Sequence, residues 1–476
     1  MSALHFVAGA VILAAELVVL VRAILRPNRE PAARLAWVTI IIVAPIVGMV
    51  AYLLVGETRT RRRKIGKAID AGLPRPAGSK AVDQALAASH HHAPFALART
   101  VDQLGATQGN IATLAADTNC AIASMVGDID AAKRTVHLCT YIWLDDHNGL
   151  KINDALVRAA GRGVAVRALA DALGSGRFIR SRHWADLRAS GVDARAALPV
   201  GNPVWAMLHG RVDLRNHRKS LIVDNRIAWC GSQNIADPEF RLKPRFAPWV
   251  DIATRWEGPV AKHCQFLFVS DWMGEGAGDI SDCLREPDGE HHGEGIIAQV
   301  IGTGPTLPFD AMPACFAELI HSARSELVVT TPYFVPDEQL LYALLSAARR
   351  GVRTTLVFPK RNDSRFVAAA SRSYYSDLIA AGARIFEFRP GLLHAKTMVV
   401  DGAVGLIGSA NLDRRSFELN FENNILFADQ ALASQVRARQ DEFVAQSDAV
   451  TAAYVAHVGL AARIWQNAAA MVSPLL

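Results

Sequence analysis

The chain has 476 residues, of which 51% are hydrophobic, and its mean hydropathy of +0.16 is high for a purely soluble protein. This length is enough for two or three domains with a large core. The net charge of +6 favours an anionic partner such as lipid headgroups, nucleic acid or a phosphate substrate. The six cysteines show no Cys-x-x-Cys pair and no dense spacing, so we expect free, buried thiols that are compatible with a reducing compartment.

Two apolar stretches, 4–25 and 35–55, open the chain. The second has 21 residues without a charge, close to the ~20 that a helix needs to cross a bilayer core. The first could be a signal peptide, but it lacks a positively charged start and a second stretch follows closely. We therefore predict a membrane anchor at 1–58 with two transmembrane helices.

Basic residues follow the second stretch in a cluster: Arg59, Arg61, Arg62, Arg63, Lys64 and Lys67. Fewer lie at or between the two stretches, so the positive-inside rule favours a cytoplasmic body. Beside a membrane the cluster would also attract anionic lipid headgroups. We interpret 59–115 as this basic segment and a connector with helical pieces. Its His90-His91-His92 run could bind metal, but no Cys or acid nearby in the sequence completes a site, so an exposed loop is expected.

The body repeats one order of elements, which indicates a tandem duplication. In each half a helix precedes a buried strand, and a second helix runs into a Gly-Val pair and another strand. This alternation predicts α/β layers in each half. We place the halves at 116–294 and 295–476, because 274–295 is rich in Gly, Asp and Glu and has no periodicity. The repeating segments are 121–132, 135–143, 155–162 and 166–170 in the first half, and 312–323, 326–334, 340–350 and 354–358 in the second.

One set of polar residues occurs once in each half, in the same register. The first copy is His217, Lys219, Asp224, Ser232 and Asn234, and the second is His394, Lys396, Asp401, Ser409 and Asn411. Glycine precedes each serine, at Gly231 and Gly408. A lone His-x-Lys would carry no information, whereas two copies fixed at six positions predict a functional site.

Each motif has the pattern of a strand, a turn and a second strand. Alternate side chains of a strand share a face, so each histidine should project with its lysine. The aspartates lie at turns, and we expect them to hold the hairpin or tie down the neighbouring half rather than attack a substrate. The glycines allow a close backbone approach, and the serines and asparagines offer donors beside the lysines.

Two His, two Lys and two Asn in one site suit phosphoryl transfer without a metal or other cofactor. Lysine binds phosphate as a point charge, and asparagine adds neutral donors. One histidine attacks phosphorus, while the other protonates the leaving oxygen and then deprotonates the incoming alcohol. Each half supplies one histidine, so we expect the halves to pack pseudo-symmetrically around one site. The residues leave open which histidine attacks.

Each histidine also needs a partner that fixes its tautomer. Glu422 follows His394 by 28 residues, and Asp251 follows His217 by 34 residues. Both acids fall in the strand-like segment after their motif. We therefore assign Glu422 to His394 and Asp251 to His217.

The duplicated motif resembles the HKD motif of the phospholipase D superfamily, and the whole chain resembles the bacterial cardiolipin synthases with two such motifs. The likeness extends to the apolar N-terminal stretches, to 414–422 after the second motif and to the closing Ser-Pro-Leu-Leu. The first half departs from the family pattern in the longer, Pro-containing segment around Asp251.

The resemblance implies a phosphatidyl group carried on histidine and passed between two molecules of phosphatidylglycerol, giving cardiolipin and glycerol. It implies that the His, Lys and Asp of both motifs are catalytic, with His217 as the nucleophile and His394 as the acid and base. It also implies the bacterial inner membrane as the location. Oligomeric state is left open.

Three other functions are weighed against this one. A membrane-bound phospholipase D would use water as the acceptor and release phosphatidic acid. A nuclease would use the basic charge for DNA, but the body has no basic stripe interleaved with aromatics. A silent scaffold would need a lost His or Lys, and both motifs are intact. The segment 436–476 is expected to be helical and to pack on the core, with the bilayer as the alternative.

Overall fold

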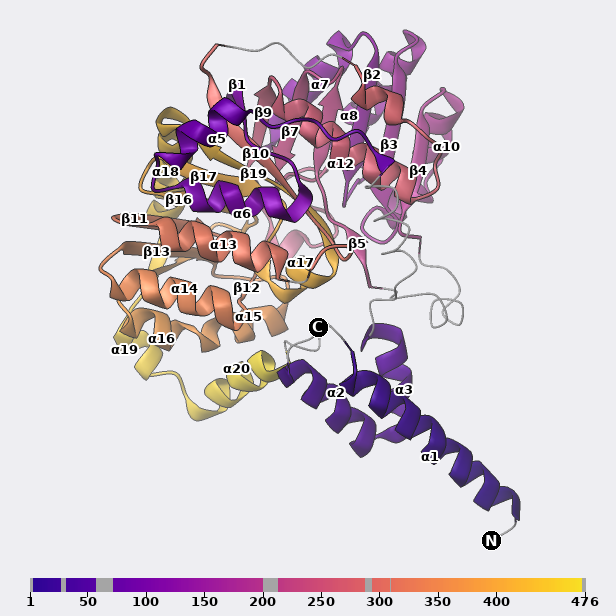
Figure 1. Ribbon diagram of the computed structural model, residues 1–476, viewed down its shortest axis with the longest axis vertical. Helices are drawn as coiled ribbons and strands as arrows, with labels where there is room; N and C mark the ends of the chain where they lie inside the picture. The colour runs from indigo at the N-terminus through magenta and orange to yellow at the C-terminus, as the bar shows by residue number, and fades with distance from the viewer. Residues whose placement is uncertain are drawn as a thin grey trace.

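The computed structural model of the chain describes residues 3–26, 31–56, 72–199, 213–286, 293–308 and 310–472. The basic cluster at 59–67 and the closing tetrapeptide 473–476 lie outside these residues. A large α/β body carries, at one side, a smaller group of apolar N-terminal helices (Figure 1).

The body is built on one mixed sheet with helices on both faces (Figure 1). Among the described residues the sheet has 16 strands, in the order β20-β14-β13-β11-β16-β17-β19-β10-β1-β9-β7-β6-β2-β3-β4, with β5 beside β19. The strands of the first half are β1 (Thr107–Leu114), β2 (Thr135–Thr140), β3 (Ala165–Asp171), β4 (Asp193–Ala197), β5 (Arg215–Asn216), β6 (Ser220–Val223), β7 (Ile227–Gly231) and β9 (Ala253–Glu257). Those of the second half are β10 (Ile296–Thr303), β11 (Glu326–Thr330), β13 (Arg353–Pro359), β14 (Arg384–Phe388), β16 (Thr397–Val400), β17 (Val404–Gly408), β19 (Asn420–Ala428) and β20 (Ser447–Val450).

The two halves have the same strand order when each is followed outward from the centre of the sheet. It is β1-β9-β7-β6-β2-β3-β4 on one side and β10-β19-β17-β16-β11-β13-β14 on the other. The antiparallel pair β1–β10 joins them. The predicted tandem α/β repeat is therefore confirmed. Residues 107–114, which the sequence interpretation places in the connector, form strand β1 at the centre of this sheet.

The helices begin and end at signals that the two halves share. Asp146 caps α8 (His147–Gly161) and Asp337 caps α14 (Glu338–Arg349), because each side chain accepts a backbone N–H from the first turn. Both helices stop before a glycine with positive φ, 85° at Gly163 and 87° at Gly351, a conformation that favours glycine. The other helices of the body are α5 (Lys80–Ala87), α6 (His92–Asp102), α7 (Thr118–Ala131), α9 (Gly176–Ile179), α10 (Arg182–Ala189), α12 (Val260–Gly274), α13 (Ala311–Ser322), α15 (Arg365–Ser373), α16 (Tyr375–Ala380), α17 (Arg414–Glu418), α18 (Gln430–Ala445), α19 (Ala452–Ala456) and α20 (Leu460–Val472).

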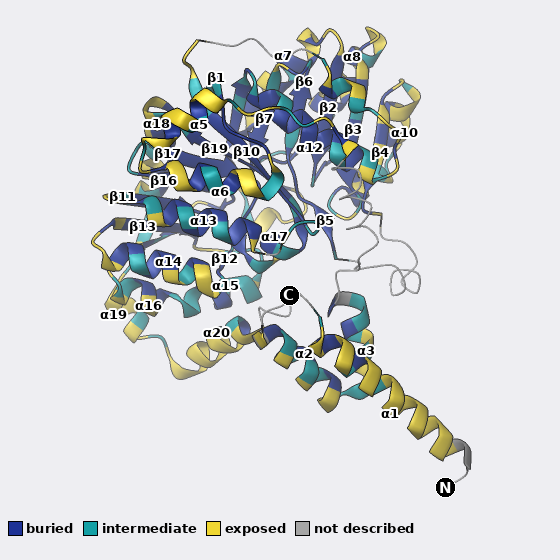
Figure 2. Ribbon diagram, viewed as in Figure 1, coloured by how far each residue is buried: buried dark blue, intermediate teal, exposed yellow. Residues whose placement is uncertain are grey.

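The central strands are buried because helices cover both faces of the sheet (Figure 2). Every residue of β2 is buried, and only the first residue of β11 is partly exposed. Such continuous burial explains why these strands show no strict alternation of apolar and polar residues. The sheet and its helices thus form a frame. Short strands that lie beside the ends of its long strands position the polar residues described below.

The N-terminal helices differ from the predicted pair of spans. Among the described residues one helix is long and apolar enough to cross a membrane, His5–Ile24 within α1 (Ala3–Ile24). The second stretch breaks at Ala44, because Pro45 begins a new helix, giving α2 (Pro31–Val43), α3 (Pro45–Ala51) and a π-helical turn, Tyr52–Gly56. The second continuous transmembrane helix is therefore not confirmed.

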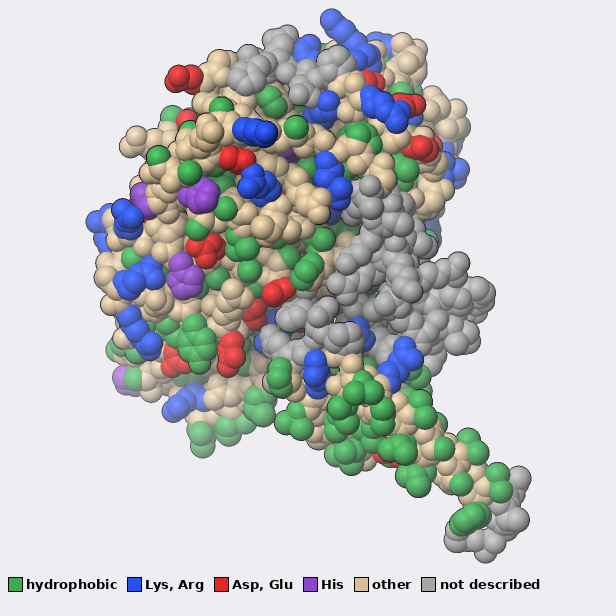
Figure 3. Space-filling view, in the orientation of Figure 1, with side chains coloured by type: hydrophobic (Ala, Val, Ile, Leu, Met, Phe, Trp, Pro, Cys, Tyr) green, Lys and Arg blue, Asp and Glu red, His purple; other side chains and the backbone are tan. Residues whose placement is uncertain are grey.

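The two short helices pack on each other and on α1. Trp37 and Ile41 of α2 are buried against Tyr52 and against Val19 and Ala23 of α1. Gly48 allows this approach, since a Cβ there would lie 2.6 Å from the carbonyl oxygen of Ile40. The outer faces of these helices are apolar (Figure 3).

The C-terminal helix α20 packs on the body, as expected, but only along one side. Ala469 is buried beside Ala370 of α15, and the Trp465 ring meets that of Phe366. Leu460 and Met471 remain 72% and 78% exposed. Apolar side chains thus gather on α20 and on α1 to α3, along the same side of the body (Figures 1 and 3).

Candidate active site

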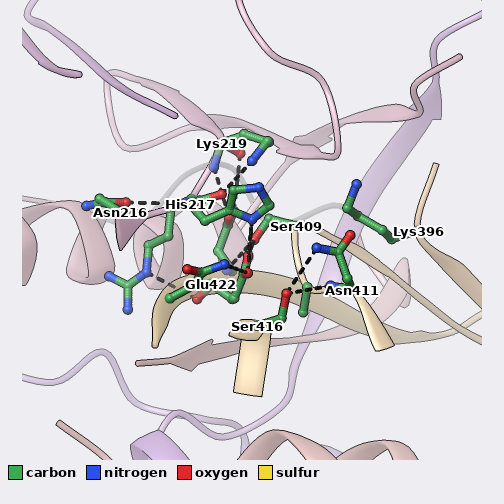
Figure 4. Close-up of polar contacts among 12 residues, drawn as sticks. Asn216, His217, Lys219, Lys396, Ser409, Asn411, Ser416 and Glu422 are labelled. Atoms are coloured by element: carbon green, nitrogen blue, oxygen red, sulfur yellow. Dashed lines mark hydrogen bonds and ion pairs between the residues drawn. The ribbon is translucent and has the colours of Figure 1, made fainter. Parts of the chain in front are cut away.

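His217 is held by a strand that pairs with the other half. β5 pairs in parallel with the start of β19, and the His217 N–H donates to Phe421 O at 2.9 Å. The next residue of β19 is Glu422. Nδ1 of His217 lies 2.9 Å from both carboxylate oxygens of Glu422, and both side chains are buried (Figure 4).

His394 is held in the mirrored way. β15 (Leu392–Leu393) pairs in parallel with β8 (Trp249–Val250) of the first half, and the His394 N–H donates to Val250 O at 2.8 Å. Asp251 follows directly, and its Oδ1 lies 2.5 Å from Nδ1 of His394. In both pairs Nδ1–H donates to the carboxylate, which leaves Nε2 of each histidine available for chemistry.

The predicted pairing of acids and histidines is therefore wrong. Glu422 contacts His217 and Asp251 contacts His394, so each acid serves the histidine of the opposite half. The cause is the exchange of β5 and β15: each short strand before a histidine pairs with the residues just before the acid of the other half.

The serines and glycines of the motifs hold the acids from within their own half. Ser232 Oγ donates to Asp251 Oδ1 at 2.6 Å, and Ser409 Oγ donates to the Glu422 carboxylate. The glycine before each serine permits this approach. A Cβ at Gly231 would lie 2.2 Å from Ile252 O, and one at Gly408 would lie 2.1 Å from Asn424 Oδ1. The expected close backbone approach is confirmed.

The motif lysines lie directly beside the histidines. Lys219 Nζ donates to His217 O at 2.7 Å, and Lys396 Nζ donates to His394 O at 2.6 Å. Both are buried, and burial lowers the pKa of Lys219 to about 8 and that of Lys396 to about 7. The histidines do not lie within regular strand, because β6 begins at Ser220 and β16 at Thr397. The hydrogen bond from each lysine to its histidine confirms the prediction that the two residues lie together.

The two histidine–acid pairs differ in charge. Burial raises the pKa of Glu422 to about 7, and burial, with the charge of Lys219, holds the pKa of His217 well below its ordinary value. Burial alone would raise the pKa of Asp251, but the charge and hydrogen bond of His394 outweigh it and lower that pKa. Burial also lowers the pKa of His394, with Asp251 opposing the shift. The pKa values of both histidines are thus lowered, whereas those of the two acids are shifted in opposite directions, upward for Glu422 and downward for Asp251.

Asp224 and Asp401 lie at the opposite end of their hairpins from the histidines. Asp224 has φ 53° and accepts from the N–H groups of 133, 134 and 135, where β2 begins. Asp401 has φ 52° and accepts from those of 324, 325 and 326, where β11 begins. A four-residue strand separates each aspartate from its lysine region, roughly 13 Å at the rise of a strand. They hold the hairpin, as predicted, and they tie it to their own half rather than the neighbouring one.

One cavity of about 310 Å³ opens between the halves and reaches both histidines. Asn234 and Asn411 also line it, as predicted. Asn234 Oδ1 accepts from Ile142 N–H, and its buried Nδ2 has no partner among the described residues. Asn411 instead donates through Nδ2 to Ser416 Oγ at 3.1 Å. The site therefore brings together His217, His394, Asn234, Asn411, Asp251, Glu422, Lys219, Lys396, Ser232 and Ser409.

Several lining residues were not predicted as part of the site. Tyr141 and Tyr333 follow equivalent strands of the two halves, and the Tyr141 ring lies 4.8 Å from that of His217 and 5.4 Å from Lys219 Nζ. The repeat of Tyr141 as Tyr333 is a signal that the sequence contains. Arg215 and Arg415 add positive charge to the wall, and Trp249 lies 4.9 Å from the His394 ring. These three residues do not recur at equivalent positions of the two halves, so the sequence offers no comparable signal for them.

Known proteins match both the fold and the motif pattern. The family described as "Cardiolipin synthase, PLD-like domain" matches 125–247 and 316–443, one segment in each half, and "Phospholipase_D-nuclease N-terminal" matches 17–57. The phosphatidylserine synthase of Haemophilus influenzae has the same fold over 77% of this chain and 95% of that one, with a TM-score of 0.58 and 16% identity. These findings define a phospholipase D-like protein with two domains around one site.

Sequence relatives identify the family of the chain within the phospholipase D-like proteins. "Cardiolipin synthase A" of Erwinia tasmaniensis is 35% identical over 95% of both chains, and that of Serratia proteamaculans is 34% identical over 90% of both. The chain belongs to the cardiolipin synthase family.

Proposed function

We propose that the protein transfers a phosphatidyl group from one phosphatidylglycerol to another, giving cardiolipin and glycerol. The observation that carries this proposal is the pair of histidines on one cavity, each with Nδ1 on a carboxylate and Nε2 available. Two such groups are what a double displacement at phosphorus requires, since one attacks and the other moves a proton. The family supports a lipid as both donor and acceptor.

In the first step Nε2 of His217 attacks the phosphorus of the donor. A P–N bond forms, the bond from phosphorus to the glycerol oxygen breaks, and His394 Nε2–H gives that oxygen its proton. In the second step His394 takes the proton from a hydroxyl of the acceptor phosphatidylglycerol. That oxygen attacks phosphorus, the P–N bond breaks and His217 is restored.

The electrostatics of the site support this division of roles. A nucleophile must be neutral, and the pKa of His217 is held well below its ordinary value. A general acid needs a partner that favours its protonated form, and Asp251 acts on His394 in this sense, against the lowering of its pKa by burial and Lys396. Lys219, Lys396 and Asn234 would stabilise charge on the phosphate oxygens.

The test uses the purified chain in micelles with labelled phosphatidylglycerol, with the products separated by chromatography. Cardiolipin and free glycerol in equal amounts are expected. Phosphatidic acid as the only lipid product would show a hydrolase and overturn the proposal.

We also propose that the anchor crosses the bacterial inner membrane once and holds the body at its cytoplasmic face. The 22 residues of α1 span about 33 Å, whereas the 13 of α2 span about 20 Å, less than a bilayer core. The α2–α3 hairpin begins and ends on the side of the body (Figure 1), so it would enter the membrane beside α1 and return. The N-terminus would then lie in the periplasm.

A cysteine-labelling experiment tests this topology. Ser2→Cys should react with a membrane-impermeant maleimide in intact cells, whereas the exposed Cys120 of the body should react only after lysis. Protection of Ser2→Cys until lysis would instead show two crossings.

A further inference from the structure

We propose that His90, His91 and Asp401 form a binding site for a divalent transition-metal ion such as Zn²⁺, apart from the cavity of the two histidines. One ring nitrogen of each histidine and one carboxylate oxygen lie within 4.8 Å of one another. His90 Nε2 is 3.6 Å from Asp401 Oδ2. Ligands of a tetrahedral Zn²⁺ with bonds near 2.0–2.2 Å lie roughly 3.3–3.5 Å apart, so this pair is already near ligand spacing.

The hydrogen bonds of His91 fix which of its nitrogens carries the proton. Ser322 Oγ donates to Leu319 O at 2.8 Å, so its hydrogen is already used. In the 3.2 Å contact between Ser322 Oγ and His91 Nδ1, the histidine must therefore be the donor. Nε2 is left with a lone pair, and this buried atom has no partner among the described residues.

A metal ion requires such a nitrogen. Metal-bound histidines bind through one unprotonated nitrogen and donate the other N–H to a neighbour that orients the ring, which is the arrangement of His91 with Ser322. His91 is 4% exposed, so its unpartnered Nε2 is enclosed by the fold and away from solvent.

Asp401 provides a fixed negative charge. Its carboxylate accepts hydrogen bonds from the backbone N–H groups of Arg324, Ser325 and Glu326. The carboxylate is thus oriented before any ion binds.

No acid lies near the histidine run in the sequence, so the run alone does not predict a metal site. The fold supplies that acid from the turn of the second motif. The ligand set of two imidazoles and one carboxylate suits Zn²⁺ and its neighbours in the first transition series. The ion would fasten the α5–α6 loop, which follows the anchor, to the β16–β17 turn of the body.

The test measures Zn²⁺ per chain in the full-length protein, purified in detergent micelles without a polyhistidine tag, stripped with a chelator and dialysed against Zn²⁺. The variant is His90→Ala, which removes one exposed ligand, and the matched control is His92→Ala, its exposed neighbour outside the group. Ser322→Ala keeps all three ligands and removes only the acceptor of His91 Nδ1–H. The thermal unfolding midpoint of each stripped protein serves as the check of folding.

Wild type and His92→Ala should each hold about one ion, and Zn²⁺ should raise their unfolding midpoints. His90→Ala should bind at least tenfold more weakly, and Ser322→Ala about tenfold more weakly, a loss typical of a removed outer partner. The proposal is overturned if wild type holds no ion, or if His90→Ala holds as much as His92→Ala. Because no step of the assay uses activity, failure here leaves the transferase proposal untouched.

Discussion

The two halves of the body share a backbone plan and differ in charge where they meet. Each contributes a histidine, and each contributes the acid that binds the histidine of the other. One pair uses Glu422, whose pKa burial raises to about 7, and the other uses Asp251, whose pKa is lowered. The aromatic neighbours differ too, with Tyr141 against His217 and Trp249 against His394. A duplicated scaffold thus places its two histidines beside acids whose pKa values are shifted in opposite directions.

Replacing either histidine should have the largest effect on turnover. His217→Ala should reduce turnover by at least about 1,000-fold and abolish the phosphatidyl-enzyme, because no nucleophile remains. His394→Ala should reduce turnover by about 100- to 10,000-fold while still forming the adduct slowly, because only the proton donor is lost. Labelled lipid retained on the denatured protein measures the adduct. An adduct in His217→Ala but not in His394→Ala would reverse the roles.

Removal of the acids tests the charge difference itself. Asp251→Asn should cost about 100-fold in kcat, because the pKa of His394, already lowered by burial, falls further and a smaller fraction of His394 is protonated. The pH optimum should also move to lower pH, where His394 regains its proton. Glu422→Gln should cost about tenfold, since a neutral amide oxygen still accepts from His217 Nδ1–H. A larger loss in Glu422→Gln than in Asp251→Asn would contradict this assignment.

Replacing a motif lysine should have the smallest effect, which is a change in the pH dependence of kcat/KM that differs between the two halves. Both pKa values are lowered, so the charged form that binds phosphate is lost as the pH rises, first at Lys396, near 7, then at Lys219, near 8. Lys396→Arg keeps its charge, so the fall of kcat/KM at high pH should move upward by about one pH unit, although the absolute rate drops. Lys219→Arg is the matched control and should leave the first fall in place. Identical pH profiles of kcat/KM for wild type and both variants would show that the lysines do not cause the fall at high pH.

Much of the fold and site could be predicted from the sequence because the signals are local or repeated. The Gly-Val pairs predicted where α8 and α14 end, and the doubled His-Lys-Asp pattern predicted both hairpins. The partner of each histidine could not be predicted, since pairing between β5 and β19 depends on segments about 200 residues apart. The same holds for Asp401 beside His91. The count of apolar residues over 35–55 predicted one continuous span. The structure instead has a break there, because Pro45 begins a new helix.

The exchange of β5 and β15 also determines when the protein becomes active during its synthesis. The partner of His217 is Glu422, which is synthesised 205 residues later, and the partner of Asp251 is His394, which is synthesised 143 residues later. A chain that stops after the first half therefore exposes two polar groups whose burial requires partners that do not yet exist. Domains of such chains usually fold as they emerge from the ribosome, but here neither histidine–acid pair can close until the second half has docked. Both histidine–acid pairs therefore form only after the second half has been synthesised through Glu422.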